Sequence, residues 1–314
     1  MLDLRRLRLL SEFARRGSIA ATAAALGYTP SAVSQQLSTL EREAGLPLLD
    51  RTARSAELTD AGRRLAARAV EILSMVEAAE TELSEQAGTP SGRVVVTAFP
   101  TAAVAFAPAL AHSLRDHSGL TFVLRQAKQR DGMLQVGSGE VDIALVDDWS
   151  GHLAEQAPPT LKFFPLCTDP LMLVVPKDHP MADPRRPVDL RELLGEAWLA
   201  APAGEPSRQV VDRLLDAVGG APPVPWEFEG LHTILSLVAR GIGIAAVPAL
   251  ALAVGEAGVA ARELPGGVAR DVYAVTRAAS VGRPSVRATL SAVHAAAASR
   301  PQPHANGVQS LIKA

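Results

Sequence analysis

The sequence has little of what most enzymes depend on. Cys167 is the single cysteine in 314 residues, so the chain cannot form an internal disulfide or a multi-cysteine metal site. His112 and His117 are five residues apart, a spacing that does not place both on one helix face as a ligand pair. The phosphate-binding GxxxxGKS/T motif and the GxSxG nucleophile motif are both absent. We therefore expect no metal, no cofactor and no catalytic activity.

Apolar segments long enough for a membrane or a signal peptide are not evident either. The N-terminal segment MLDLRRLRLLSEF carries arginines and acids throughout and lacks the continuous apolar core of a signal peptide. The uncharged stretch Gly241–Gly255 is shorter than the ~20 residues that span a bilayer and contains Pro248. A lone cysteine suits a reducing compartment. We expect a cytoplasmic protein without a membrane partner.

Residues 18–62 carry the most informative pattern of the chain. An apolar stripe with the spacing of one helix face is formed by Val33, Leu37, Leu40 and Ala44. A second stripe, of small uncharged hydrogen-bonding side chains, is formed by Ser31, Ser34, Gln35 and Ser38. Solvated helix faces usually carry Glu and Lys, whereas short donors and acceptors suit a helix that reads base edges in a DNA major groove. The pattern predicts a DNA-reading helix; the alternative is an ordinary helical hairpin with solvated serines.

Capping residues mark the ends of three helices. Thr29 and Pro30 form an N-cap followed by a proline in the first turn, where its missing N–H costs nothing. Glycines able to take the left-handed C-terminal conformation stand at Gly17, Gly27 and Gly45. The sequence therefore predicts helices over residues 3–16, 19–26 and 30–44.

Charge is unevenly distributed along the chain. Residues 1–68 contain eleven arginines and seven acids, a local charge of +4 in a chain of net charge −2, so the remainder carries −6. A basic end joined to an acidic body is typical of a nucleic-acid-binding module attached to another domain. Directly after the third helix, Arg51 and Arg54 are placed to reach phosphates or a minor groove.

A long helix is predicted over residues 60–88, between a Thr59-Asp60 cap and Gly88-Thr89-Pro90. Its apolar residues follow 4-3-4-3-4 spacing and are Leu65, Ala69, Ile72, Val76, Ala79 and Leu83. This spacing is typical of the seam of a coiled coil or a helix pair. We expect the helix to join two domains and to pair with a second copy, which would make the DNA site two-fold. The alternative is that the stripe packs on its own domain.

The chain from about residue 92 alternates β-branched runs with helical stretches. Strands are expected at residues 93–99, 120–126, 141–146, 171–175, 197–201 and 242–247, with helices that include 130–139 and 206–218. This alternation predicts parallel sheets with right-handed crossovers. In such sheets ligands gather at the carboxyl ends of strands, near helix N-termini. Thr101, directly after the first strand, could hold a carboxylate or another acceptor there.

These features together resemble the LysR-type transcriptional regulators. The N-terminal resemblance rests on GSIAATAAALGYTPSAVSQQLSTLEREAGLPLLDR and LTDAG, which are similar to the family's winged helix-turn-helix. The C-terminal resemblance rests on GEVDIALV at 139–146, PLMLVVPKDHPMA at 170–182 and VARGIGIAAVP at 238–248. The N-terminal resemblance implies that Ser31, Ser34 and Gln35 face bases or the adjacent backbone and that Arg51 and Arg54 lie on the wing.

Two positions depart from the family pattern. Pro30 stands where the family often has a base-contacting glutamine, and proline cannot donate that hydrogen bond. Leu49 stands where the family commonly has phenylalanine, which keeps an apolar docking residue.

The resemblance also implies the domain organisation. A winged helix-turn-helix domain would span residues 1–59, a linker or dimerisation helix 60–88, and an α/β effector-binding domain of the periplasmic-binding-protein fold 92–300. The effector domain would have one subdomain over about 92–166 and 270–300 and another over about 167–269, with a small-molecule cleft between them. The tail 301–314 lies outside the resemblance and is expected to be disordered. The implied effector-binding residues are Thr101, Ala203, Gly204, His232, Thr233 and Val247; the alternative for each is ordinary capping or packing.

The leading functional hypothesis is a bacterial, sequence-specific transcription regulator that forms a dimer or tetramer on double-stranded DNA. A small-molecule effector would bind one arrangement of the C-terminal domains better than another and so increase the population of that arrangement. The alternative is a solute-binding protein with an accessory helical interaction module. That alternative predicts a signal peptide and leaves the serine–glutamine stripe without a partner.

Overall fold

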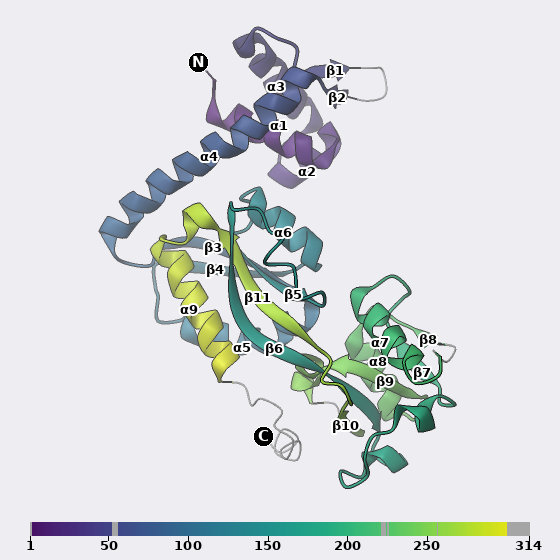
Figure 1. Cartoon of the computed structure of the whole chain (residues 1–314). Helices are drawn as coiled ribbons and strands as arrows, with labels where there is room; N and C mark the ends of the chain where they lie inside the picture. Colours follow the sequence, from purple (N-terminus) through teal and green to yellow (C-terminus); the bar gives the residue numbers. More distant parts are fainter. Residues whose placement is uncertain (1, 52–55, 221–223, 225, 256, 300–314) are drawn as a thin grey trace.

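The structure, a computed structural model, describes residues 2–51, 56–220, 224, 226–255 and 257–299. In chain order it comprises a helical N-terminal domain, one long helix and an α/β region of two lobes (Figure 1). The sequence predictions for Arg54 and for the tail 301–314 lie outside the described residues.

The N-terminal domain contains three short helices and a small hairpin. Its elements are α1 (Leu4–Arg16), α2 (Ile19–Leu26), α3 (Pro30–Ala44), β1 (Leu49–Arg51) and β2 (Ala56–Leu58). The side chains of Ser18 and Thr29 accept the N–H groups of Ala21 and Ala32 at 3.1 and 3.2 Å and so cap α2 and α3. The three predicted helices are confirmed, and each is followed by a left-handed glycine, at φ +73°, +70° and +68°. The domain core is formed by buried residues that include Leu7, Leu10, Phe13, Val33, Leu37, Leu40 and Leu48.

The long helix α4 (Asp60–Ala87) runs from this domain to the α/β region (Figure 1). Its 28 residues span about 42 Å at 1.5 Å per residue, and the predicted helix is confirmed. Gly62 allows its first turn to press against the hairpin, because a Cβ at this position would lie 2.1 Å from the carbonyl oxygen of Leu48. The same carbonyl accepts the N–H of Thr59 at 3.0 Å.

The α/β region is built from two lobes joined by two long strands. The first lobe contains β3 (Gly92–Ala98), α5 (Pro100–Ser113), β4 (Leu120–Gln126), α6 (Gln129–Gly137), β5 (Ile143–Asp148) and α9 (Pro284–Ala298). The second lobe contains β7 (Trp198–Ala200), α7 (Pro206–Asp216), β8 (Trp226–Glu227), α8 (Leu231–Ala239), β9 (Ile244–Pro248) and β10 (Val259–Glu263). The crossing strands are β6 (Leu161–Pro176) and β11 (Ala269–Arg277). Short 3₁₀ turns are η1 (Pro180–Ala182), η2 (Leu190–Leu193), η3 (Ala249–Val254) and η4 (Ala278–Ser280).

Among the described residues the strand order is β4-β3-β5-β11-β6-β9-β7-β8, with β10 also paired to β6. The expectation of parallel sheets is only partly right. The pairs β3–β4, β3–β5, β7–β8 and β7–β9 are parallel, but every pair that includes β6 or β11 is antiparallel. The reason is topological: the chain passes from the first lobe to the second along β6 and returns along β11, so the crossing strands run in opposite directions.

Each lobe has its own core. In the first lobe, α5 and α9 bury Phe106, Leu110 and Val293 against one sheet face, and α6 covers the other face (Figure 1). In the second lobe, buried Trp198 donates its Nε1–H to the carbonyl of Leu193 at 3.0 Å, which satisfies the indole in an apolar interior. None of the described helices is both long and apolar enough to cross a membrane.

Candidate functional site

The outer face of α3 carries the serine–glutamine stripe. Val33, Leu37 and Leu40 are at most 1% exposed and fix the inner face of the helix. Ser31 and Gln35 are consequently exposed, and Ser34 and Ser38 are half-buried on the opposite side. The two stripes read from the sequence therefore lie on different faces of one helix.

Arg51 at the end of β1 lies over this stripe. Its Nη1 donates to Ser34 Oγ at 2.7 Å, its Nη2 donates to Ser38 Oγ at 2.9 Å, and Nη2 lies 3.4 Å from Glu41 Oε2. The expectation that Arg51 extends freely towards DNA is therefore incomplete, because its guanidinium also ties the hairpin to α3. An arginine has five N–H donors, so N–H groups remain for a phosphate.

Glu41 was missed by sequence reasoning. Its Oε1 accepts the N–H groups of Leu48 and Leu49, each at 2.9 Å, and holds the first strand of the hairpin against α3. Glu41, Ser34 and Ser38 together anchor the hairpin through backbone and side-chain contacts. The sequence signal was an acid at helical spacing from two serines, three residues after Ser38 and seven after Ser34.

The apolar stripe of α4 divides into two halves. Ala69 is fully buried, and Leu65 and Ile72 pack against the same N-terminal core that holds α1. The predicted place of Ala69 in a dimer seam is therefore wrong, since its own domain covers it, while Leu65 and Ile72 are half-buried and their part in a dimer stays a prediction. Val76 and Ala79 are half-buried, while Leu83 is 69% exposed and Met75 65% exposed.

Two ion-pair groups fasten the N-terminal part to the first lobe. On α4, Glu77 accepts from Arg277 Nε at 2.6 Å and from Ser280 Oγ at 2.5 Å. Burial alone would raise the pKa of Glu77, but the hydrogen bonds and charge of Arg277 outweigh it and hold the pKa below its ordinary value. At the end of α1, Arg16 Nη2 donates to Glu140 Oε2 at 2.8 Å.

A buried charge cluster sits where the crossing strands leave the first lobe. Arg270 on β11 donates to Asp169 on β6 at 2.9 Å, to Asp147 at the end of β5 at 2.8 Å, and to Thr101 Oγ1 at 2.8 Å. Its guanidinium carbon also lies 4.6 Å from the centroid of the Phe99 ring. Arg270 is 5% exposed and Asp169 is 2% exposed. Because water hardly reaches either group, each charge is stabilised by the other instead.

Thr101 lies in the first turn of α5, where the sequence places it. Its hydroxyl oxygen accepts from Arg270, so a protein cation already occupies the side where a bound carboxylate was expected. The hydroxyl proton remains able to donate to another acceptor. Sequence reasoning missed Arg270, Asp147 and Asp169; the available signal was Asp169, an acid in the middle of a long, mostly apolar stretch.

The facing edge of the second lobe carries the remaining predicted effector residues. Ala203 and Gly204 are exposed just before α7, and His232 and Thr233 are exposed in the first turn of α8. Val247, on β9, is fully buried in the core that includes residues of α8, so the prediction that it lines the effector cleft is wrong.

One ion pair connects the two lobes at this edge. Lys128, the residue before α6, lies 3.1 Å from Glu205, the residue before α7. The hydrogen bond and charge of Glu205 raise the pKa of Lys128, with a further contribution from Glu229. The N-termini of α6 and α7 are thus brought together from different lobes.

Comparison with known proteins assigns both parts of the chain. A family model described as "Bacterial regulatory helix-turn-helix protein, lysR family" matches residues 4–63, and one described as "LysR substrate binding domain" matches residues 87–298. The uncharacterized HTH-type transcriptional regulator YfeR of Shigella flexneri is 31% identical over 253 residues, 80% of this chain and 79% of the relative. The HTH-type transcriptional regulator CbbR of Xanthobacter flavus is 29% identical over 250 residues, 78% of this chain and 72% of the relative.

Solved structures show the same fold over nearly the whole chain. A full-length variant of OxyR from Pseudomonas aeruginosa has a TM-score of 0.67 at 18% identity, covering 94% of this chain and 98% of that one. Full-length CbnR complexed with its target DNA has a TM-score of 0.54 at 20% identity, covering 94% and 100%. With both family models matched in this order, the chain belongs to the LysR family of DNA-binding transcriptional regulators, with an effector-binding substrate domain.

Proposed function

We propose that α3 is the helix of this regulator that reads DNA sequence, with Ser31, Ser34, Gln35 and Ser38 facing base edges. The observation that carries this proposal is the contact of Arg51 with Ser34 and Ser38, which joins the stripe and the hairpin into one surface. Arg51 and, from the sequence alone, Arg54 would lie beside the phosphate backbone. Pro30 offers no donor, so readout falls to the side chains that follow it.

The oligomer would form through the outer half of α4. Val76, Ala79 and Leu83 share one face of the helix, and Leu83 is largely exposed. Pairing two copies along this face would place two α3 helices on half-sites about one DNA turn apart. The proposed divisions are residues 1–59 for DNA binding, 60–88 for the linker and 92–300 for the effector domain.

The effector would bind between the lobes and change their arrangement. Thr101 from the first lobe and Ala203, Gly204, His232 and Thr233 from the second are the proposed contacts. The Lys128–Glu205 pair supports this location because it already joins helix N-termini from the two lobes. The protein would act by binding rather than catalysis, and in the cytoplasm, where its DNA target is.

The first experiment is selection of genomic fragments by the purified full-length protein at near-physiological salt, followed by sequencing. We expect enrichment of a few two-fold symmetric sites. Gln35→Ala should lose discrimination at the base it contacts, by about 1–3 kcal/mol, while Gln156→Ala, an exposed glutamine in the α/β region, should not. Retention of fragments without any sequence preference would contradict the proposed reading helix.

A further inference from the structure

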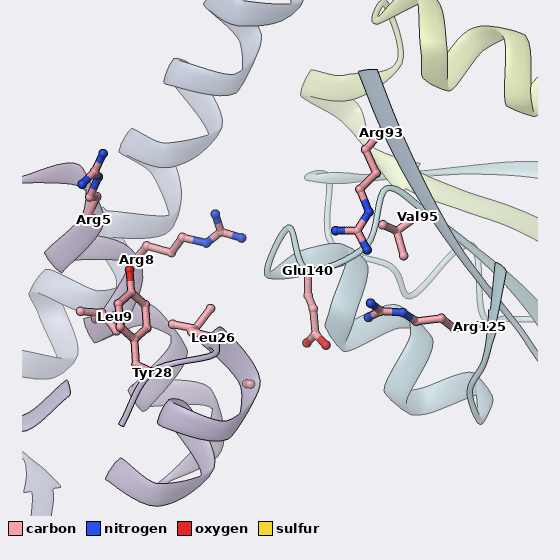
Figure 2. A pocket seen from close by; sticks show the side chains of 10 residues that line it. Arg5, Arg8, Leu9, Leu26, Tyr28, Arg93, Val95, Arg125 and Glu140 are labelled. Carbon is pink, nitrogen blue, oxygen red and sulfur yellow. The ribbon is translucent and has the colours of Figure 1, made fainter. Parts of the chain in front are cut away.

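A pocket of about 430 Å³ lies between the N-terminal domain and the first lobe. Arg5, Arg8 and Tyr28 line it from the N-terminal domain, and Arg93, Arg125 and Glu140 line it from the first lobe (Figure 2). Figure 2 shows the side chain of Arg8 pointing from α1 towards the first lobe, where Arg93, Glu140 and Arg125 lie. The volume is within the range of about 300–1,000 Å³ that small-molecule sites usually have. It is separate from the proposed effector site between the lobes.

Regular secondary structure directs the four arginines to this place. Arg5 and Arg8 are three residues apart on α1 and so share one helix face. Arg93 pairs with Thr121 and Arg125 with Thr97 across the parallel strands β3 and β4. Because side chains two and four residues apart along a strand share a face, Arg93 and Arg125 project from the same side of the sheet.

These arginines are not neutralised by the protein. Glu140 already pairs with Arg16 at 2.8 Å and with Arg15 at 3.5 Å, and both of these arginines also pair with Glu12. No salt bridge within the described part of the chain includes Arg5, Arg8, Arg93 or Arg125. Each guanidinium carries a positive charge, so four arginines and the single acid Glu140 give the pocket a net positive charge. A multivalent anion between the two walls would relieve the repulsion among them.

We propose that this pocket binds a small polyphosphate, such as a nucleoside triphosphate, with arginines of both domains on its phosphate oxygens. The planar fork of a guanidinium matches two phosphate oxygens, which favours phosphate over a single carboxylate. Tyr28 is 49% exposed at the rim and offers an aromatic face on which a nucleobase can stack. The ligand would hold α1 against the first lobe and thereby limit the orientations open to the DNA-binding domain. This last consequence rests on the proposed function, whereas the binding site does not.

The test is isothermal titration of the full-length protein with inorganic tripolyphosphate and, separately, with adenosine triphosphate, without DNA. We expect one saturable site per chain for each probe. Arg93→Gln/Arg125→Gln on the first lobe and Arg5→Gln/Arg8→Gln on α1 should each raise Kd at least tenfold. The control pair Arg240→Gln/Arg287→Gln, exposed arginines outside the pocket, should leave Kd unchanged. Thermal unfolding without ligand should show that all three double variants remain folded.

Several outcomes would overturn the proposal. Absence of saturable binding to the wild-type protein would do so, as would an equal loss of binding in the control pair, which would indicate a diffuse counter-ion effect. A loss of binding in only one of the two pocket variants would contradict the proposal that arginines of both domains contact the ligand. If the pocket variants keep anion binding and a separate titration with DNA shows that they bind it more weakly, the arginines contact the DNA backbone instead. Since binding is measured without DNA, failure of the proposed DNA reading would leave this result unaffected.

Discussion

Arg51 contacts two serines of the predicted DNA-reading stripe of α3 and also Glu41, to which the sequence analysis gave no role. By donating to Ser34 and Ser38 and approaching Glu41, it makes the hairpin and the helix one unit. The same residue can serve DNA binding in two ways: through its charge and through the position it gives the serines. Arg270 has a similar role in the effector domain, because its hydrogen bonds connect β11 with β6, β5 and α5.

Arg51→Ala should weaken binding to all DNA sequences by a similar factor. A lost phosphate contact lowers the slope of log K against log salt by about one unit, which fluorescence anisotropy at several salt concentrations would measure. Arg51→Lys should restore the slope but only part of the affinity, because lysine lacks the planar fork whose two terminal nitrogens contact Ser34 and Ser38 separately. An unchanged slope in Arg51→Ala would show that Arg51 acts only within the protein.

Asp169→Asn should destabilise the effector domain by about 1–3 kcal/mol, because it removes one of the two carboxylates that pair with the buried Arg270 while Asp147 still balances its charge. Urea unfolding of the full-length protein would report this as a lower midpoint. Asp271→Asn is the matched control, because Asp271 lies on the neighbouring strand, is partly exposed and accepts a hydrogen bond from Thr168 at 2.8 Å. Equal effects of the two variants would contradict a special role for the buried cluster.

The two sites differ in how far the sequence predicted them. The stripe of α3 was predictable because caps at Thr29 and Gly45 and the periodicity between them are local signals. The Arg270–Asp169 pair was not, because its members are 101 residues apart and meet only through the pairing of β11 with β6. The burial of Val247 was missed for a related reason: which side of a strand faces a helix depends on the whole lobe.

At the scale of elements, α4 has different neighbours along its length. Its first turns pack on α1 and the hairpin, its middle is fastened to the first lobe through Glu77, and its last described side chains reach solvent. The periodicity of its stripe is uniform and gave no indication of this change. The helix itself was predictable from its cap and spacing, but the partner of each turn was not, because that depends on the fold of the domains at both ends.

Gly62→Ala should destabilise the N-terminal domain by about 1–3 kcal/mol, since the new methyl group would lie 2.1 Å from the carbonyl oxygen of Leu48. DNA affinity should fall with it. Gly137→Ala on α6 is the control: nothing lies within 4 Å of an added Cβ there, so the change should be neutral or slightly stabilising. Thermal unfolding of both variants tests this, and equal stability would contradict the close approach at Gly62.

Glu77 gives the α4 contact a pH dependence. A carboxyl whose pKa is depressed in the folded state stabilises it above the ordinary pKa of about 4.3 and loses this contribution as the pH falls through the depressed value. The difference in free energy of unfolding between the wild-type protein and Glu77→Gln should therefore be largest near neutral pH and shrink on acidification. Glu71→Gln, an exposed glutamate of the same helix, serves as control. A difference that does not change with pH would contradict the ion pair with Arg277.

At the scale of the whole molecule, exposed apolar residues of α4 indicate where a second copy would pack. Leu83 and Met75 are the most exposed large apolar residues of the described chain, and both are on this helix. Large apolar side chains left in water favour association, and a two-fold DNA site needs two copies. Among the described residues, the crossing strands, the packing of Leu250 in η3 against the first-lobe core and the Lys128–Glu205 pair join the two lobes.

Leu83→Asp should shift the oligomer towards monomer, because a charge would have to be buried in the paired helices. Light scattering after size-exclusion chromatography would measure the mass, and affinity for a two-fold DNA site should fall in parallel. Ile242→Asp, at a 41% exposed apolar residue of the second lobe, should leave the mass unchanged. An oligomer that resists Leu83→Asp would place the principal interface elsewhere.

The position of β11 between β5 and β6 has a consequence for synthesis on the ribosome. The first lobe cannot close its sheet until β11 has been translated, more than a hundred residues after β5 began. The N-terminal domain emerges complete while that central strand is still missing, and domains fold as units in the order in which they emerge. The nascent chain therefore acquires its DNA-binding surface well before it acquires a finished effector domain to control it.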